Sequence, residues 1–311
     1  MKNDKNDKLL RLPSYGVWSA ALTPLKADLS IDHEKLVTHG RFLLNEGCHG
    51  IGLFGTTGEA NSFSVDERMN ALEFVLQNGL STESLMVGTG CCALSDTVKL
   101  TQHAIDHGIT KILLLPPFYY KNVGDEGLFY AFIEVVNRLN YKKLELYLYH
   151  FPAMSQIPLS INLIAKLCSA LPDIIAGVKD SSGNLDHSLK LASNFPNLSI
   201  FPGNETHLLE TLDNGCAGVI SATANANAKG IRQIFDSWLN GNAETPTLQE
   251  HALSVREAFG RHALVPALKE FAHWSSKNQS WLRMRPPLVP LTPEEIKTLH
   301  SDLSSLSLTS E

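Results

Sequence analysis

Long apolar segments are absent from this 311-residue sequence, and so is an excess of positive charge. No uninterrupted apolar run approaches the ~20 residues that a membrane-spanning helix needs. Lys and Arg number 26 against 32 Asp and Glu, and the resulting net charge of −6 argues against a general affinity for nucleic acid or anionic membranes. Residues 1–8 are polar and lack the apolar segment of a secretory signal. We therefore expect a cytoplasmic protein that binds neither nucleic acid nor membranes.

Cysteine and histidine patterns typical of metal sites are also missing. The sequence contains no Cys-x-x-Cys pair, and we expect all five scattered cysteines to be reduced: Cys48, Cys91, Cys92, Cys168 and Cys216. The twelve histidines form no His-x-His, His-Glu-x-x-His or similar ligand set. The sequence therefore predicts neither a disulfide nor a bound metal.

What the sequence contains instead is a regular alternation of short apolar runs and helix-forming stretches. Eight runs have the composition of strands: 17–23, 50–54, 85–88, 112–115, 144–149, 174–179, 199–201 and 218–221. Most are apolar throughout, as expected for parallel strands that are covered on both faces. The stretches between them have helical patterns, such as the apolar positions 128, 132, 135 and 139, which share one helix face.

Eight such units favour one architecture. An open doubly wound sheet usually has fewer strands, whereas eight parallel strands close a (β/α)8 TIM barrel. The strand-like runs stop after Asn240, and the patterns at 248–262, 265–276 and 293–306 are helical. We predict a polar N-terminal tail (1–13), a catalytic TIM barrel (14–241) and a C-terminal helical appendage (242–311).

Lys179 ends the sixth apolar run, at the strand end where TIM-barrel active sites lie. An amine at the mouth of an apolar barrel is desolvated, which disfavours its charged form and supplies free amine at neutral pH. A free amine beside a carbonyl substrate forms a Schiff base. The position also suits a lysine that leaves its strand for solvent, and this residue alone does not decide between the two interpretations.

Tyr149 ends the preceding run, so it is expected to face the same cavity as Lys179. A phenol can donate and accept the proton that moves during imine formation, although a tyrosine here could also simply fill the top of the barrel. His150 is interpreted as a structural hydrogen-bonding residue.

Gly55-Thr56-Thr57-Gly58 follows the second run and is typical of a loop that binds a small carboxylate. Its glycines let backbone N–H groups approach a ligand, and its hydroxyls add donors. A glycine turn with threonines as local caps is the alternative. The overlapping G-x-G-x-x-G pattern at 50–55 lies within the strand and precedes no helix, so we reject a dinucleotide site.

Five stretches occur together in one order: 55–59 (GTTGE), 116–120 (PPFYY), 149–152 (YHFP), 177–183 (GVKDSSG) and 218–225 (GVISATAN). With this set, the chain resembles the dihydrodipicolinate synthase/N-acetylneuraminate lyase family of class I pyruvate-dependent aldolases over about residues 14–300. The resemblance implies that Lys179 forms an imine with pyruvate and that Tyr149 transfers protons. It also implies that Thr56 links Tyr149 to a second tyrosine. Tyr119 matches a tyrosine that reaches into a neighbouring subunit's site, which implies a homotetramer built as a dimer of dimers.

The resemblance further implies how substrate is bound. Thr57 and the loop at Gly58 hold the pyruvate carboxylate, and the main-chain carbonyls of Gly203 and Ile220 line the pocket. The substrates are pyruvate and an aldehyde, and neither a metal nor an organic cofactor is required.

Three positions bear on the aldehyde. Met154 stands where the synthases carry an arginine that grips the carboxylate of aspartate semialdehyde, and losing this contact removes about 1.5–3 kcal/mol. Glu205 begins the Glu-Thr pair that replaces the acidic pair of sialate lyases, and Ala222 replaces a serine.

These matches leave three hypotheses for the function. The first is a lyase that cleaves or forms a 4-hydroxy-2-oxo acid, either a 2-keto-3-deoxy sugar acid or a sialate-like compound, with pyruvate as product or donor. The second is 4-hydroxy-tetrahydrodipicolinate synthase, which condenses pyruvate with aspartate semialdehyde. The third is a barrel that binds a keto acid without turning it over.

Overall fold

The computed structural model describes residues 2–308, and its strands form the barrel that the sequence predicts. Ala217 N–H donates to the Ile200 carbonyl at 2.8 Å, so β7 and β8 approach each other and the barrel is nearly closed. All neighbouring pairs in the sheet are parallel, in the order β7-β6-β5-β4-β3-β2-β1-β8. The strands are β1 (Gly16–Ala20), β2 (Gly50–Leu53), β3 (Leu85–Gly88), β4 (Lys111–Leu114), β5 (Glu145–His150), β6 (Ile175–Asp180), β7 (Ser199–Pro202) and β8 (Gly218–Ser221).

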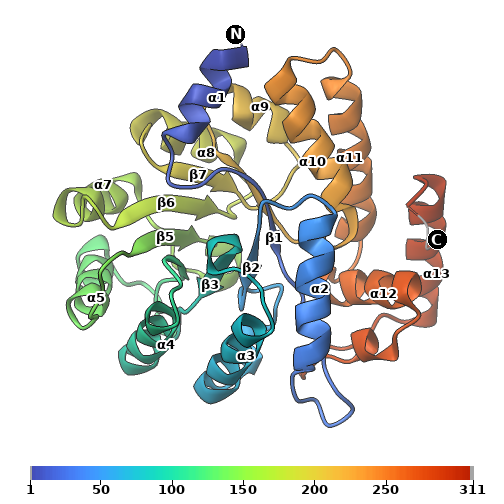
Figure 1. Cartoon of the computed structure of the whole chain (residues 1–311), viewed down its shortest axis with the longest axis horizontal. Helices are drawn as coiled ribbons and strands as arrows, with labels where there is room; N and C mark the ends of the chain where they lie inside the picture. The colour runs from blue at the N-terminus through green and yellow to red at the C-terminus, as the bar shows by residue number, and fades with distance from the viewer. Residues whose placement is uncertain (1, 309–311) are drawn as a thin grey trace.

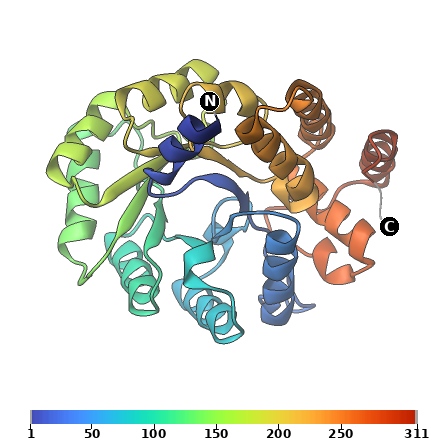
Figure 2. The same cartoon turned by 45° about the horizontal axis from the view of Figure 1, so that its top comes forward.

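Helices surround the barrel, as Figures 1 and 2 show. Ser64 and Glu67 form the capping box that opens α3, while Gly241, with φ of 71°, ends α10 in the left-handed conformation. Short turns of helix occur at η1 (Ala60–Ser62) and η2 (Thr82–Ser84). The barrel helices are α2 (His33–Asn45), α3 (Val65–Gln77), α4 (Leu94–Asp106), α5 (Asp125–Asn137), α6 (Pro152–Ser155), α7 (Ile161–Ala170), α8 (Leu185–Asn194), α9 (Leu208–Asp213) and α10 (Ala224–Asn240).

The two faces of the strands bury two different sets of side chains, because successive residues of a strand point to opposite faces. One set packs against the surrounding helices and makes up the larger core. The other set fills the interior of the barrel: Trp18, Ala20, Met86, Leu113, Tyr147, Tyr149, Ala176, Phe201, Ala217 and Ile220. The interior is therefore apolar, and polar groups at its C-terminal rim stand out.

The polar N-terminal segment forms a helix, α1 (Lys2–Leu10), where we predicted a tail. Leu9 is buried, and Lys5 Nζ donates to the Trp238 carbonyl at 2.9 Å while lying 4.3 Å from the centre of the Trp238 ring. Tertiary contacts thus stabilise a segment whose own sequence is too polar to signal a helix. Met1 and residues 309–311, part of the predicted tail and appendage, lie outside the described residues.

The predicted C-terminal helices are present as α11 (Thr245–Gly260), α12 (Leu264–Ser276) and α13 (Pro293–Ser305), with η3 (Gln279–Leu282) between the last two. They enclose a core of their own, and the barrel contributes Leu22 and Ala222 to it. The appendage is therefore packed against the β1 and β8 side of the barrel. No helix in the described part of the chain combines the length and apolar character needed to cross a membrane.

Candidate active site

Lys179 and Tyr149 lie side by side at the C-terminal ends of β6 and β5. The two residues are partners in the strand register, and each side chain is only 4% exposed. Lys179 Nζ lies 4.4 Å from the centre of the Tyr149 ring. The structure therefore brings together, in the apolar interior, the amine and the phenol that the sequence singled out.

The Lys179 amine has no carboxylate partner in the described part of the chain. Within residues 2–308 its side chain takes part in no hydrogen bond or ion pair, and its amine lies over the face of the Tyr149 ring. The amine is thus not committed to a structural ion pair and is available to react.

The Gly55–Gly58 loop after β2 lies against this pair. Thr56 Oγ1 is 3.3 Å from the Tyr149 hydroxyl. Thr57 is buried, and Thr23 Oγ1 donates to the Gly58 carbonyl at 2.8 Å. A Cβ at Gly58 would come within 2.9 Å of the Ala21 carbonyl oxygen, so only glycine allows the loop to pack this closely. The loop is therefore held rigidly next to the Lys179–Tyr149 pair.

The residue that follows this loop, Glu59, is tied to the C-terminal appendage. Glu59 has a left-handed backbone conformation (φ 56°), and its buried carboxylate forms an ion pair with Lys269 of α12. Lys269 Nζ also donates to the Arg283 carbonyl at 2.7 Å, and Arg285 N–H donates to Glu59 Oε2 at 3.1 Å. The sequence analysis did not identify Lys269 as the partner of Glu59. The one available signal was a lysine within the apolar stretch of α12.

Arg285 extends this connection to α3. Its guanidinium donates to the Ser62 carbonyl at 2.6 Å and to Glu67 Oε2 at 3.0 Å. The hydrogen bonds from Arg285 lower the pKa of Glu67 to about 2. The appendage thus anchors both ends of the segment from Glu59 to Glu67, which directly follows the loop that carries Thr56 and Thr57.

Gly203 and Ile220 also lie at the barrel rim. Gly203 follows β7 and donates its N–H to the Asp180 carbonyl at 2.7 Å, while a Cβ on it would meet Ser181 Oγ at 2.2 Å. Ile220, on β8, points into the barrel interior. Gly203 therefore lies next to the end of β6, and Ile220 faces the barrel interior. Both positions are compatible with the lining of a pocket around Lys179.

Three residues predicted to contact the aldehyde lie in different surroundings. Met154, on α6, is 66% exposed, and Ala222 packs in the core of the C-terminal helices. Glu205 is fully buried, and its carboxylate accepts hydrogen bonds from Ser221 and Thr223. Because Ser221 is adjacent to the inward-facing Ile220, it points to the helix side of β8, and so does the carboxylate that it binds. The structure brings none of the three against Lys179.

Tyr119 is separate from the Thr56–Tyr149 pair within one chain. Its side chain is 74% exposed and lies edge-on to Tyr120, with 5.4 Å between the ring centres. Among the described residues, neither Thr56 nor Tyr149 is its hydrogen-bond partner.

A polar group behind the site fixes the ends of β5 and β6. His150 Nδ1 accepts the Leu159 N–H at 3.0 Å, and Asp180 Oδ2 accepts from His187 Nδ1 at 2.9 Å and from Ser188. Burial lowers the pKa of His150 to about 4, which keeps this ring neutral. Burial also opposes ionisation of Asp180, but hydrogen bonds from His187 and its neighbours outweigh it and lower the pKa of the carboxyl. The residues next to Tyr149 and Lys179 are thereby held in place.

Comparison with known proteins finds relatives that match this chain over nearly its whole length. A sequence model described as the Dihydrodipicolinate synthetase family matches residues 13–306. An uncharacterized DapA-like lyase of Chloroflexus aurantiacus is 36% identical over 287 residues, covering 92% of this chain and 95% of that protein. The 2-dehydro-3-deoxy-phosphogluconate/2-dehydro-3-deoxy-6-phosphogalactonate aldolase of Sulfurisphaera tokodaii is 27% identical over 286 residues, covering 91% and 93%.

The fold also matches that of a solved structure. The crystal structure of dihydrodipicolinate synthase from Agrobacterium tumefaciens matches with a TM-score of 0.87 and 29% identity, covering 94% of this chain and 99% of that one. A synthase and an aldolase are thus about equally similar to this chain.

Proposed function

The chain belongs to the dihydrodipicolinate synthetase family, and on this premise we propose that it is a lyase that cleaves or forms a 4-hydroxy-2-oxo acid through a pyruvate imine on Lys179. The substrate is a 2-keto-3-deoxy sugar acid or a sialate-like compound. The observation that carries the proposal is the buried, unpaired Lys179 amine against the ring of Tyr149.

The first half of the reaction makes the imine. The Lys179 amine adds to the C2 carbonyl of the keto acid, and water leaves once its oxygen has received a proton. The Tyr149 hydroxyl supplies that proton, and the Thr56 hydroxyl, 3.3 Å away, accepts or returns a proton as the phenol changes state. The carboxylate of the keto acid binds at Thr57 and the backbone N–H groups of the Gly55–Gly58 loop.

The second half breaks or makes the carbon–carbon bond. The imine withdraws electrons, so the C3–C4 bond breaks as the C4 hydroxyl gives its proton to the Tyr149 oxygen. An aldehyde leaves, and the enamine that remains takes a proton at C3. Hydrolysis of the imine then releases pyruvate and restores the free amine. In the synthetic direction, the enamine attacks the aldehyde instead. These steps require no metal or organic cofactor.

The surroundings of the site favour an uncharged aldehyde. Met154 supplies no positive charge, and the acidic side chain at Glu205 is engaged by Ser221 and Thr223. Phe151, whose ring stacks on that of Tyr149 with 5.7 Å between the centres, offers an apolar contact beside the reacting atoms, and the exposed Met154 would contact only the far end of a longer aldehyde. Gly203 and Ile220 complete the pocket with main-chain carbonyls, and Ala222 and Glu205 shape it from behind the strands.

The second candidate is the synthase reaction with aspartate semialdehyde. The similarity to the Agrobacterium tumefaciens synthase favours it, and it shares the same imine. It requires another group to bind the semialdehyde carboxylate in place of an arginine at position 154.

The proposal also covers the oligomeric state of the enzyme and its place in the cell. The exposed Tyr119 would complete the Thr56–Tyr149 relay of a neighbouring subunit, in a homotetramer arranged as a dimer of dimers. We place the enzyme in the cytoplasm.

A substrate panel tests the proposed function. Pyruvate release from 2-keto-3-deoxygluconate and from sialate is measured against consumption of aspartate semialdehyde with pyruvate. We expect cleavage of at least one of the first two to exceed the synthase reaction, and Lys179→Ala to abolish it. Faster turnover of aspartate semialdehyde would instead support the synthase, and imine formation without turnover of any aldehyde would support the keto-acid-binding barrel.

Met154→Arg tests the position of the aldehyde. An arginine there should raise kcat/KM for aspartate semialdehyde about tenfold or more, because a charge-assisted hydrogen bond contributes about 1.5–3 kcal/mol. Val289→Arg, at another exposed apolar residue, controls for the added surface charge. An equal effect of both substitutions would show that position 154 does not face the second substrate.

A further inference from the structure

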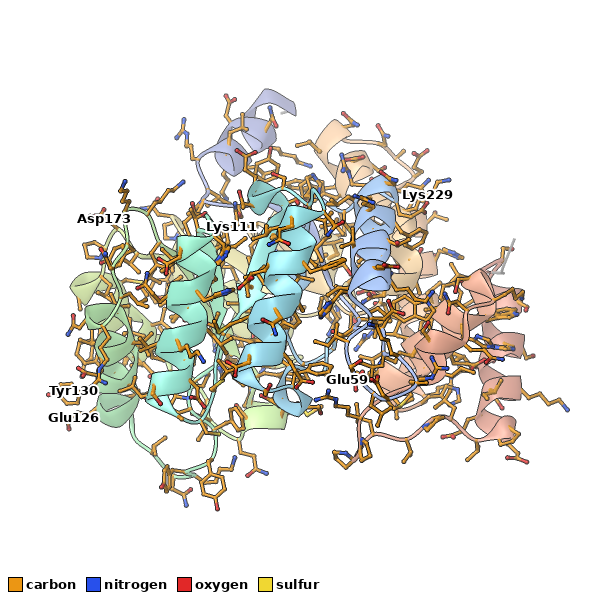
Figure 3. All side chains as sticks on the ribbon, turned by 60° about the horizontal axis from the view of Figure 1, so that its bottom comes forward. Glu59, Lys111, Glu126, Tyr130, Asp173 and Lys229 are labelled. Carbon is orange, nitrogen blue, oxygen red and sulfur yellow. The ribbon has the colours of Figure 1, made fainter. Side chains whose placement is uncertain are left out.

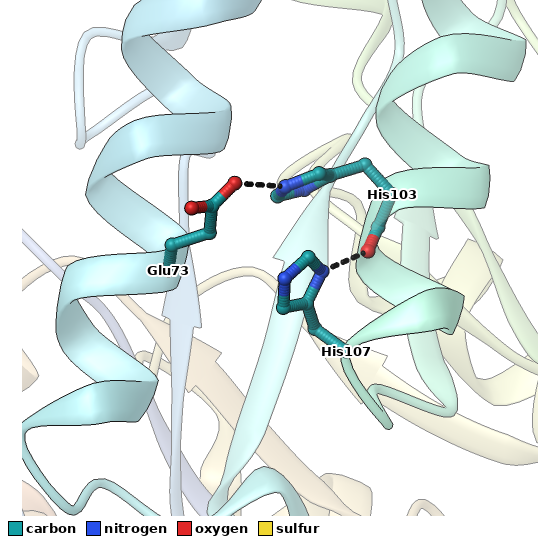
Figure 4. A group of neighbouring side chains, drawn as sticks. All are labelled: Glu73, His103 and His107. Atoms are coloured by element: carbon teal, nitrogen blue, oxygen red, sulfur yellow. Dashed lines mark hydrogen bonds and ion pairs between the residues drawn. The ribbon is translucent and has the colours of Figure 1, made fainter.

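Two helices on the outside of the barrel carry a group of side chains unrelated to the proposed reaction. His103 on α4 and His107 at its C-terminal end face Glu73 on the neighbouring α3 (Figure 4). The His103 and His107 rings lie 4.3 Å apart between centres. One possible ligand atom of each of the three residues lies within 4.8 Å of the other two.

The hydrogen bond of His107 determines which of its nitrogens is free. Nδ1–H donates to the His103 main-chain carbonyl at 2.8 Å, so Nε2 carries the lone pair. Figure 4 shows Nε2 turned toward the space between the two helices. Histidines that bind metals typically donate their other ring N–H to a carbonyl or a carboxylate in this way. The ring is therefore already in the tautomer and orientation that a metal needs.

His103 and Glu73 supply the other two donors. His103 Nε2–H donates to Glu73 Oε1 at 2.8 Å, and the second nitrogen, Nδ1, is buried with no hydrogen-bond partner in the described part of the chain. Because Nδ1 is unoccupied, the ring proton can move to it when an ion takes its place at Nε2, unlike in a ring whose Nδ1 already accepts a hydrogen bond. The ring thus interacts only toward Glu73 and the space beside His107.

We infer that Glu73, His103 and His107 form a binding site for a divalent transition-metal ion such as Zn²⁺, which would link α3 to α4. Two imidazoles and a carboxylate suit Zn²⁺, Ni²⁺ or Cu²⁺, whereas Mg²⁺ and Ca²⁺ require more oxygen ligands. Ligands that lie about 2.0–2.2 Å from Zn²⁺ lie about 3.4 Å from one another, so small side-chain rotations complete the site. This inference revises the expectation of no metal, because the His-x-x-x-His spacing becomes a ligand pair only when Glu73 approaches from another helix.

The second group of this kind, His150, Asp180 and His187, fits a metal less well. His150 Nδ1 accepts a main-chain N–H, so its remaining nitrogen carries the ring proton and has no lone pair to offer. The carboxylate of Asp180 already accepts from His187, Ser188 and the Ser182 N–H. This group is saturated by its own hydrogen bonds.

Calorimetric titration of the chelator-treated full chain with Zn²⁺ tests the inference. We expect one ion per chain at the strongest site and a rise in Tm when Zn²⁺ is added. Glu73→Gln and His107→Gln should each weaken this binding by at least about tenfold, since each removes one of three ligands. His251→Gln, at an exposed histidine of α11, is the matched control and should bind as the wild type does. Cys92→Ser controls for zinc captured by the exposed thiol.

Several outcomes would overturn the inference. Wild-type protein that binds no Zn²⁺, or Glu73 and His107 variants that bind it as tightly as wild type, would show that the three residues are only a contact between helices. Loss of binding in His187→Gln or Cys92→Ser instead would place the ion elsewhere. Because neither Glu73 nor His107 touches the Lys179 site, pyruvate release by the Glu73 and His107 variants should equal that of wild type, which would show that they are folded.

Discussion

Two lysines are buried among the residues whose side chains the structure describes, and their surroundings distinguish a reactive residue from a structural one. Lys269 forms an ion pair with Glu59, whereas Lys179 has the ring of Tyr149 beside it and, within residues 2–308, no carboxylate partner. Burial alone would not distinguish them, since both side chains are almost completely inaccessible. The difference explains why we assign the imine to Lys179.

Removing the hydroxyl of Tyr149 should separate proton transfer from imine formation. Tyr149→Phe keeps the ring against Lys179 but loses the proton carrier, so we expect kcat to fall about 10²- to 10³-fold. Steady-state kinetics of pyruvate release provides the measurement. Tyr147→Phe, at the preceding interior tyrosine of β5, should leave kcat within a few-fold of wild type. Equal losses in both variants would contradict a specific role for the Tyr149 hydroxyl.

Buried histidines make the stability of the protein depend on pH. Burial lowers the pKa of His39, His49 and His150 to about 4 each. Between pH 6.5 and 4 the unfolded chain therefore binds more protons than the folded one, so the free energy of unfolding falls as the pH falls. The lowered pKa of His39 alone should reduce the free energy of unfolding by up to about 2 kcal/mol between pH 7 and pH 5.

Urea denaturation at pH 7 and pH 5 measures this effect. His39→Gln removes one titrating group, so the difference in unfolding free energy between the two pH values should be smaller than in wild type. An unchanged difference would contradict the assignment to His39.

At the scale of elements, the segment from Glu59 to Glu67 connects the barrel to the C-terminal helices. Figure 3 places Glu59 beside those helices and, like Glu126 at the start of α5, toward the end of the barrel opposite Lys111, where β4 begins. The same segment begins where the Thr56–Thr57 loop ends. The appendage therefore contributes to the position of the loop that is proposed to bind the carboxylate.

Breaking the Glu59–Lys269 ion pair on one side should be severe. Lys269→Met leaves a buried carboxylate without a cation and should reduce the free energy of unfolding by about 3–5 kcal/mol. Glu59→Gln combined with Lys269→Met removes both charges and should recover much of that loss. Lys99→Met, which breaks the exposed pair with Asp66, is the control and should cost less than about 1 kcal/mol. Urea denaturation of the four proteins tests this, and a double variant as unstable as Lys269→Met would contradict it.

The local parts of this architecture could be predicted from the sequence. Most of the eight strands are continuous apolar runs, and the pairing of Tyr149 with Lys179 follows because consecutive strands of a TIM barrel are neighbours. The α1 helix could not be predicted, since Leu9 and Lys5 are stabilised by contacts far away in the chain. The partners Glu59 and Lys269 are likewise 210 positions apart, and no local pattern connects them.

At the scale of the whole molecule, a single chain leaves Tyr119 in solvent. If the relay is completed by a neighbouring subunit, Tyr119→Ala should lower kcat while the Lys179 imine still forms. Sedimentation should show a homotetramer for the wild type. A monomeric protein with full activity would contradict a role for Tyr119 across subunits.

Reduction with borohydride in the presence of pyruvate tests the central claim most directly. Hydride fixes an imine as a stable secondary amine, and peptide mass analysis identifies the residue that carries it. We predict one pyruvate-derived adduct on Lys179, absent from Lys179→Ala and retained in Tyr149→Phe. An adduct on another lysine, or none on wild-type protein, would contradict the assignment of Lys179 as the Schiff-base residue.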